Sequence, residues 1–100
     1  MLDKFDRKLE EFDLILHYDC GNIFMGLVVE VKPNSLWYII IQDKYYHCYK
    51  YNIRRSSRVV KIDITDEILN ATFRDYTGYP GSGTIKDAIT FTRNEYINSK

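Results

Sequence analysis

Alternating apolar and polar residues run from Phe12 to Ile64, and this pattern constrains the fold more than any other feature of the chain. A period of about two is typical of half-buried β-strands. Gly21 lies in the sequence Asp-Cys-Gly-Asn, which predicts a hairpin turn because glycine and asparagine tolerate a positive φ. Gly26 falls inside the next apolar run, where glycine weakens strand pairing and therefore predicts a sharp bend. The pattern as a whole predicts a small, strongly bent β-barrel.

The predicted barrel has five strands separated by short turns. The segment Lys32-Pro33-Asn34-Ser35 predicts one of these turns, because proline presets its own φ and has no N–H to donate to a ladder. The pair Arg54-Arg55 followed by two serines predicts another. The strands themselves are expected at about 12–18, 23–31, 36–41, 45–51 and 58–64.

Helical spacing of apolar residues appears at both ends of the chain. Leu2, Phe5 and Leu9 recur with charged residues between them, which predicts an amphipathic helix over 2–11. Thr65 is a candidate N-cap for a short helix over 66–72.

A longer helix is predicted near the C-terminus. Thr84 and Asp87 have the spacing of a capping box. Apolar and small residues then follow at helical spacing: Ile85, Ala88, Ile89, Thr92 and Tyr96. The β-branched residues leave a strand over 88–92 as the alternative. The predicted fold class is therefore mostly β with flanking helices (α+β), a small five-stranded, strongly bent barrel with its N-terminal helix at 1–64 and a helical extension at 65–100, within a single domain.

Charge is balanced over the 100 residues, with 14 lysines and arginines and 14 aspartates and glutamates. Its distribution is uneven, because the segment from Lys44 to Lys61 carries cations and no carboxylate. A locally basic surface is compatible with overall neutrality. The segment is therefore a candidate for binding a negatively charged ligand.

Seven residues of this segment form the predicted ligand-binding set. Lysine donates to phosphate or to a base carbonyl, tyrosine stacks on bases, and arginine makes bidentate phosphate contacts. The competing interpretation is an ordinary solvated surface of the barrel. The predicted binding residues are Tyr49, Lys50, Tyr51, Asn52, Arg54, Arg55 and Arg58.

No catalytic, metal or cofactor site is predicted. His17, His47, Cys20 and Cys48 lack the C-x-x-C spacing of a metal site, and adjacent strand residues such as His47 and Cys48 face opposite ways. The glycine-rich stretch 78–84 lacks the lysine of a phosphate-binding P-loop. It is interpreted as a connector, or as a loop in which Tyr76 or Tyr79 closes over a ligand or partner. The chain is therefore not expected to be an enzyme.

The cysteines and the hydropathy pattern predict a cytoplasmic protein. Two thiols in a chain without a secretory apolar region are expected to be reduced. The longest apolar run, Trp37 to Ile41, is too short to span a bilayer and predicts a buried strand. No membrane partner is expected.

From Leu2 to Ile64 the chain resembles the Sm-like family, with its closest local match to bacterial Hfq. The segment 21–26, Gly-Asn-Ile-Phe-Met-Gly, has the spacing of the family's first motif, and 49–53, Tyr-Lys-Tyr-Asn-Ile, is similar to the second motif of Hfq. Tyr51 stands where that motif has histidine. The resemblance implies an SH3-like or Sm-like barrel and a ring of subunits joined through edge strands, with RNA bound around the pore and Ile53 in a structural role.

Two functions follow from these patterns. The first is a ring-forming Sm-like protein that binds RNA or a small nucleotide as a homo-oligomer. The alternative is a protein-interaction module or inhibitor, such as a small virally encoded effector, in which the barrel and the loop over 74–83 bind another protein and tyrosine and arginine are hot spots.

Overall fold

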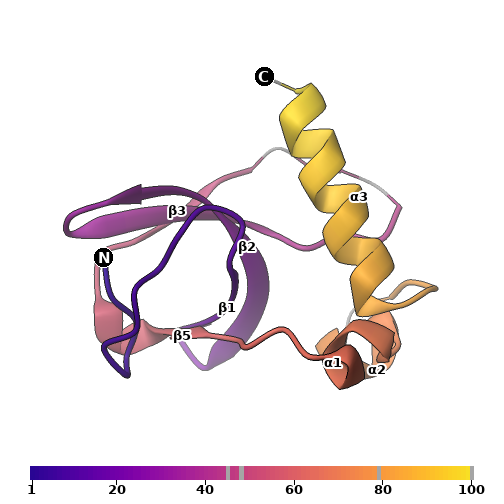
Figure 1. Cartoon of the computed structure of the whole chain (residues 1–100), viewed down its shortest axis with the longest axis horizontal. Coiled ribbons are helices and arrows are strands. Elements are labelled where there is room, and N and C mark those ends of the chain that lie inside the picture. The colour runs from indigo at the N-terminus through magenta and orange to yellow at the C-terminus, as the bar shows by residue number, and fades with distance from the viewer. Residues whose placement is uncertain (45, 48, 79, 100) are drawn as a thin grey trace. The chain divides into compact units, whose positions relative to one another are not determined.

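The computed structural model describes residues 1–44, 46–47, 49–78 and 80–99. The chain forms two units (Figure 1). Unit 1 comprises Met1–Ile40 and Tyr49–Asp63, and unit 2 comprises Ile41–Cys48 and Ile64–Lys100. The strands belong to unit 1 and the α-helices to unit 2.

Unit 1 is built on one antiparallel sheet of five strands in the order β4-β3-β2-β1-β5. A short 3₁₀ helix, η1 (Ser56–Arg58), precedes the last strand. The strands are β1 (Leu14–Asp19), β2 (Asn22–Lys32), β3 (Ser35–Ile40), β4 (Tyr51–Ile53) and β5 (Val59–Lys61).

The sheet is open, so the prediction of a closed barrel was wrong. In the described part of the chain β4 pairs only with β3, and β5 pairs only with β1. Each of these edge strands has three residues, which leaves little backbone for a ladder that would close the sheet. The strands still curve strongly (Figure 1).

The predicted turn between β1 and β2 is confirmed. Asp19 and Asn22 form the last pair of the ladder, and the two residues between them, Cys20 and Gly21, have φ of 50° and 82°. Two positive φ angles in a two-residue loop define a mirror-image turn, whose twist matches that of the flanking strands. This explains why β1 and β2 pair without irregularity over β1.

Gly26 allows a close approach of two strands, which is a different role from the predicted bend. A Cβ atom at this position would lie 2.3 Å from Cδ2 of Tyr38 and 2.6 Å from the backbone oxygen of Ile39. The missing side chain lets the ring of Tyr38 on β3 cross β2 and reach His17 on β1. The irregularity of β2 lies further along, where the pairing with β3 shifts register between Val28 and Glu30.

The first thirteen residues form an irregular loop, so the predicted helix over 2–11 was wrong. Leu2 and Lys8 form an isolated antiparallel bridge, and Asp6 and Phe12 have φ of 62° and 68°, which no right-handed helix contains. The carboxylate of Asp3 accepts hydrogen bonds from the backbone N–H groups of Phe5 and Arg7, both at 2.9 Å. These bonds close a turn, because the side chain competes with the helix for the backbone donors.

Asp3 also fastens this loop to β5. Its side chain is fully buried and accepts from the backbone N–H of Lys61 at 2.9 Å and from Nε of Arg7 at 3.0 Å. Arg7 in turn donates to the carbonyl of Lys61 and pairs with Asp63. Burial alone would raise the pKa of Asp3, but the N–H groups of Lys61, Arg7 and Phe5 and the Arg7 side chain together lower it below its ordinary value.

A cluster of buried residues packs on one face of the sheet, where side chains recur at every second position because of the pleat. Leu14, Leu27 and Ile39 on the opposite face are buried as well. Full burial of one such aliphatic side chain contributes about 1.5–3 kcal/mol. The cluster consists of Leu9, Ile15, Val28, Leu36, Tyr38, Ile53 and Val59.

Two of the predicted strands are shorter in the structure. Of the strand predicted at 45–51, only Tyr51 is in a strand, residues 46–47 and 49–50 are irregular, and residues 45 and 48 lie outside the described part. The strand predicted at 58–64 is reduced to β5, since Arg58 belongs to η1 and residues 62–64 are irregular.

Unit 2 contains α1 (Asp66–Asn70), α2 (Phe73–Thr77) and α3 (Ile85–Asn98). Thr65 caps α1 as predicted and accepts from Ile68 N at 3.3 Å. The capping box of α3 is also confirmed, with Thr84 and Asp87 exchanging two hydrogen bonds of 3.2 Å. Residues 88–92 are helical, so the alternative of a strand was wrong. None of the described helices has the length and apolar character needed to cross a membrane.

The glycine-rich stretch after α2 is held by side chains of unit 2. The carboxylate of Asp43 accepts from the backbone N–H of Ser82 at 2.6 Å. A Cβ at Gly81 would lie 2.6 Å from Cδ1 of Phe73, so only glycine fits against that ring. Tyr76, predicted to close over a ligand, is 45% exposed on α2, and Tyr79 lies outside the described residues.

Candidate functional site

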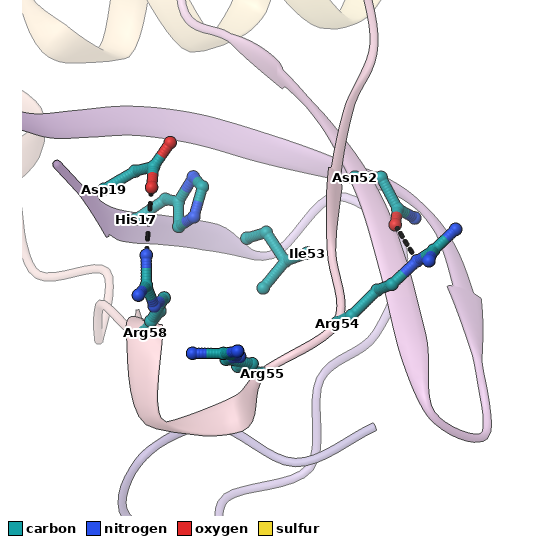
Figure 2. A pocket seen from close by; sticks show the side chains of 7 residues that line it. All are labelled: His17, Asp19, Asn52, Ile53, Arg54, Arg55 and Arg58. Atoms are coloured by element: carbon teal, nitrogen blue, oxygen red, sulfur yellow. Dashed lines mark hydrogen bonds and ion pairs between the residues drawn. The ribbon is translucent and has the colours of Figure 1, made fainter.

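A cavity of about 350 Å³ opens on unit 1 where β1, β4 and η1 approach one another (Figure 2). We call it the arginine cavity. Its size is within the range of pockets that bind small ligands. The residues that line it are His17, Asp19, Asn52, Ile53, Arg54, Arg55 and Arg58.

Strand β4 directs the first arginine into the cavity wall. Ile53 is 2% exposed and anchors the end of β4 in the core. The amide of Asn52 donates to the carbonyl of Leu36 at 3.1 Å, and its oxygen accepts from Nε of Arg54 at 3.1 Å. The first contact fixes the amide, and the second then orients the guanidinium of Arg54.

Arg58 is oriented from the other side of the cavity. Its Nη1 atom lies 2.9 Å from Oδ1 of Asp19, at the end of β1. The two side chains are 38% and 48% exposed, so this ion pair adds little to stability. It does hold the Arg58 guanidinium at the cavity, with Nε and Nη2 still available as donors to a ligand.

The side chain of Arg55 has no hydrogen bond or ion pair with any described residue, which distinguishes it from the side chains of the other two arginines. Its side chain extends below Ile53 toward the side of the cavity where Arg58 lies (Figure 2). A guanidinium without a protein partner keeps all five N–H donors available. Arg55 is therefore the cation of this cavity that is most open to an external anion.

The wall formed by β1 contains a buried polar pair. Nδ1 of His17 lies 2.8 Å from the hydroxyl oxygen of Tyr38, and the rings meet edge to face at 5.4 Å between centroids. Burial lowers the pKa of His17, the charge of Asp19 raises it and that of Arg58 lowers it, with a net shift below 6.5. His17 is therefore neutral at pH 7, and the cavity has three guanidinium groups against one carboxylate.

A second cavity of about 260 Å³ lies beside the N-terminal loop, and Arg54 lines both cavities. We call it the N-terminal cavity. Its polar lining includes the side chains of Asn34 and Ser56, which offer neutral donors. The complete lining is Met1, Leu2, Asp6, Pro33, Asn34, Arg54 and Ser56.

The structure brings four of the predicted binding residues together: Asn52, Arg54, Arg55 and Arg58 all line the arginine cavity. Tyr49, Lys50 and Tyr51 line neither of the two cavities described here. Tyr49 is 71% exposed, and the ring of Tyr51 lies 5.5 Å from that of Tyr38.

His17 and Asp19 were not predicted as parts of the site. Asp19 was assigned to the hairpin turn, and His17 was considered only as a metal ligand. Alternation along β1 places both residues on the same face as Ile15, which was the available signal. Their approach to the arginines depends on the pairing of His17 with Val59 in β5.

The described residues contain no cluster of three or more His, Cys, Asp or Glu side chains that would hold a metal ion. Cys20 is an exposed free thiol in the β1–β2 turn. Cys48 lies outside the described residues, so the predicted reduced state of the pair stays a prediction.

Comparison of the chain with protein-family models, with curated proteins and with solved structures returned no match.

Proposed function

We propose that unit 1 binds RNA or a nucleotide through the arginine cavity, with phosphate oxygens contacting Arg54, Arg55 and Arg58. One observation carries the proposal: three arginines line a single cavity that contains one carboxylate, and the side chain of one of them, Arg55, has no partner among the described residues. Guanidinium groups match the geometry of phosphate and bind it through pairs of N–H donors.

The surroundings of the arginines favour an anion over a neutral ligand. Ile53 and His17, both buried, line the cavity together with the three arginines, of which Arg54 and Arg55 are exposed and accessible to a ligand. Three cations close together attract an anion more strongly than one isolated cation does. Neighbouring cations also repel one another, and an anion that enters the cavity relieves this repulsion.

The proposal retains the resemblance to the Sm-like family as a prediction, together with assembly into a homo-oligomer. In the described part of the chain β4 has a neighbouring strand on one side only, whereas the N-terminal loop bonds to the outer backbone groups of β5 through Asp3, Lys4 and Arg7. Pairing of the β4 edge between copies of the chain is the kind of contact that the resemblance implies.

The alternative is a module that binds another protein, favoured by the exposed aromatic side chains outside the cavity. Tyr49 is 71% exposed and Tyr51 44% exposed. Tyrosine is enriched among the hot spots of protein interfaces. Binding through these rings would not depend on the arginines of the cavity.

Fluorescence anisotropy with a labelled single-stranded oligonucleotide tests the proposal. Replacement of a phosphate-binding arginine removes a charge-assisted hydrogen bond, so Arg55→Ala should weaken binding about tenfold. It should also reduce the slope of log K against log salt by about 1, because one counterion fewer is released.

Arg74→Ala is the matched control, since Arg74 is an exposed arginine of α2 and does not line either cavity. Its affinity and salt slope should equal those of the unchanged protein. Equal effects of Arg55→Ala and Arg74→Ala, or no oligonucleotide binding by the unchanged protein, would exclude the proposed site and favour the protein-binding alternative.

A further inference from the structure

We infer that the arginine cavity contains two separate phosphate subsites and therefore binds a chain with at least two phosphates, such as a segment of single-stranded RNA. This inference rests on the proposed function. It goes further by assigning the three arginines to two different phosphates, with Arg55 and Arg58 on one side and Arg54 on the other.

The first subsite is formed by Arg55 and Arg58. Asp19 holds Arg58 through Nη1, so Nε and Nη2 remain as donors. Arg55 extends toward the same side of the cavity, with no described partner (Figure 2). Asp19 offsets one of the two charges, but the free N–H groups of Arg55 and Arg58 together outnumber those of Arg54, which makes this the stronger of the two subsites.

The second subsite is centred on Arg54. Its Nε donates to the Asn52 oxygen at 3.1 Å, which leaves the two terminal nitrogens of the guanidinium for a ligand. Asn52 is itself fixed to the carbonyl of Leu36 on β3. The Arg54 group is thereby kept on the β4 side of the cavity.

Different strands hold the two subsites. Arg54 is bound by Asn52 of β4 and Arg58 by Asp19 of β1. Arg54 and Arg58 extend on opposite sides of Ile53 (Figure 2). A single phosphate held by Arg58 therefore does not reach Arg54, whereas a sugar–phosphate chain crosses Ile53 and places one phosphate at each end.

The N-terminal cavity gives the direction in which a longer chain continues. Arg54 lines both cavities, so a phosphate at this residue has the arginine cavity on one side and the N-terminal cavity on the other. Asn34 and Ser56 there supply neutral hydrogen-bonding groups suited to sugar hydroxyls. The two cavities together fit an elongated ligand better than a compact one.

Binding of ligands with one and two phosphates tests the inference, measured by calorimetry. The probes are a nucleoside 5′-monophosphate, and a dinucleotide that carries a 5′-phosphate besides its internal phosphate. Arg55→Ala should weaken both about tenfold, because both occupy the stronger subsite. Arg54→Ala should weaken the dinucleotide about tenfold and leave the mononucleotide within about twofold.

Arg74→Ala again serves as the control, and thermal melting verifies that each variant is folded. Loss of mononucleotide affinity in Arg54→Ala as large as in Arg55→Ala would show a single shared site and overturn the two-subsite inference, while the proposed function would stand. Absence of binding to both probes and to a longer oligonucleotide would overturn the proposed function as well.

Discussion

The N-terminal loop of unit 1 and the start of α3 in unit 2 use the same chemistry with opposite results. In both, a short oxygen-bearing side chain accepts hydrogen bonds from backbone N–H groups a few residues away. At Thr84 the acceptor begins a helix of 14 residues. At Asp3 the acceptor closes a turn, and the chain remains irregular up to β1.

The difference lies in where the donors come from. The capping box uses only Thr84 and Asp87, so it satisfies the first N–H groups of the helix locally. Asp3 takes three donors from its own loop, two backbone N–H groups and Nε of Arg7, and a fourth from Lys61, which is 58 residues away in the sequence. A carboxylate held by a distant strand stabilises the loop only when the sheet is folded. The loop is therefore a tertiary structure, whereas the start of α3 is encoded in its own sequence.

Asp3→Ala should have the largest effect on stability, because it removes the side chain that holds the N-terminal loop to β5. The change removes the acceptor of three backbone N–H groups and of the Arg7 guanidinium, which is 35% exposed and keeps its bonds to Lys61 and Asp63. A buried donor left without its acceptor costs about 1–3 kcal/mol, so we expect the free energy of unfolding to fall by about 3 kcal/mol in denaturant titrations.

Glu11→Ala is the control for Asp3→Ala, because it removes an exposed carboxylate of the same loop. Its unfolding free energy should change by less than about 0.5 kcal/mol. A loss below about 1 kcal/mol in Asp3→Ala would mean that the carboxylate does not hold the loop to β5.

Thr84→Ala should have a smaller effect on stability, because it removes a cap that acts only at the start of α3. Loss of an N-cap side chain typically costs about 1 kcal/mol, and the effect should be confined to the first turn of α3. Hydrogen exchange of residues 85–88 should accelerate, while exchange in the sheet of unit 1 stays unchanged.

Thr84→Ser should restore the protection of α3, since serine keeps the capping hydroxyl. Thr90→Ala, at an exposed position inside the same helix, serves as the control for loss of a threonine side chain. Acceleration that spreads to the strands of unit 1 would argue against a purely local role for the cap.

The same distinction between local and tertiary interactions explains what the sequence predicted. The turn at Cys20 and Gly21 and the capping box of α3 depend on neighbouring residues, and both were predicted correctly. Helical spacing in the first residues led to a wrong prediction, because the N–H groups there are taken by Asp3. Apolar periodicity alone does not reveal this competition.

Only the part of the candidate site that is contiguous in sequence could be predicted. Arg54, Arg55 and Arg58 are close neighbours along the chain, and they line one cavity. His17 and Asp19 join them only through the pairing of β1 with β5, which no local pattern specifies. Gly26 was recognised as unusual, but its function depends on the ring of Tyr38 from another strand.

The smallest expected effect is a loss of stability in mild acid, since it arises from the protonation of a single imidazole, that of His17. The pKa of His17 is lowered in the folded protein because burial disfavours the charged ring. The unfolded chain therefore binds a proton more readily than the folded chain does. The resulting stabilisation is complete above the unfolded pKa of about 6.5, and it is lost as the pH falls from there through the lower folded value.

The pKa of Asp3 is also lowered, and its contribution follows at more acid pH, present above the ordinary value of 3.8 and lost as the pH falls through the folded value. Both groups belong to unit 1, so acid should accelerate hydrogen exchange, corrected for its intrinsic pH dependence, in the strands before it does so at the start of α3. His17→Gln should remove the step near pH 6.5, and His47→Gln should retain it. A step that persists in His17→Gln would show that another group titrates, and the buried pair of His17 and Tyr38 would then have no part in it.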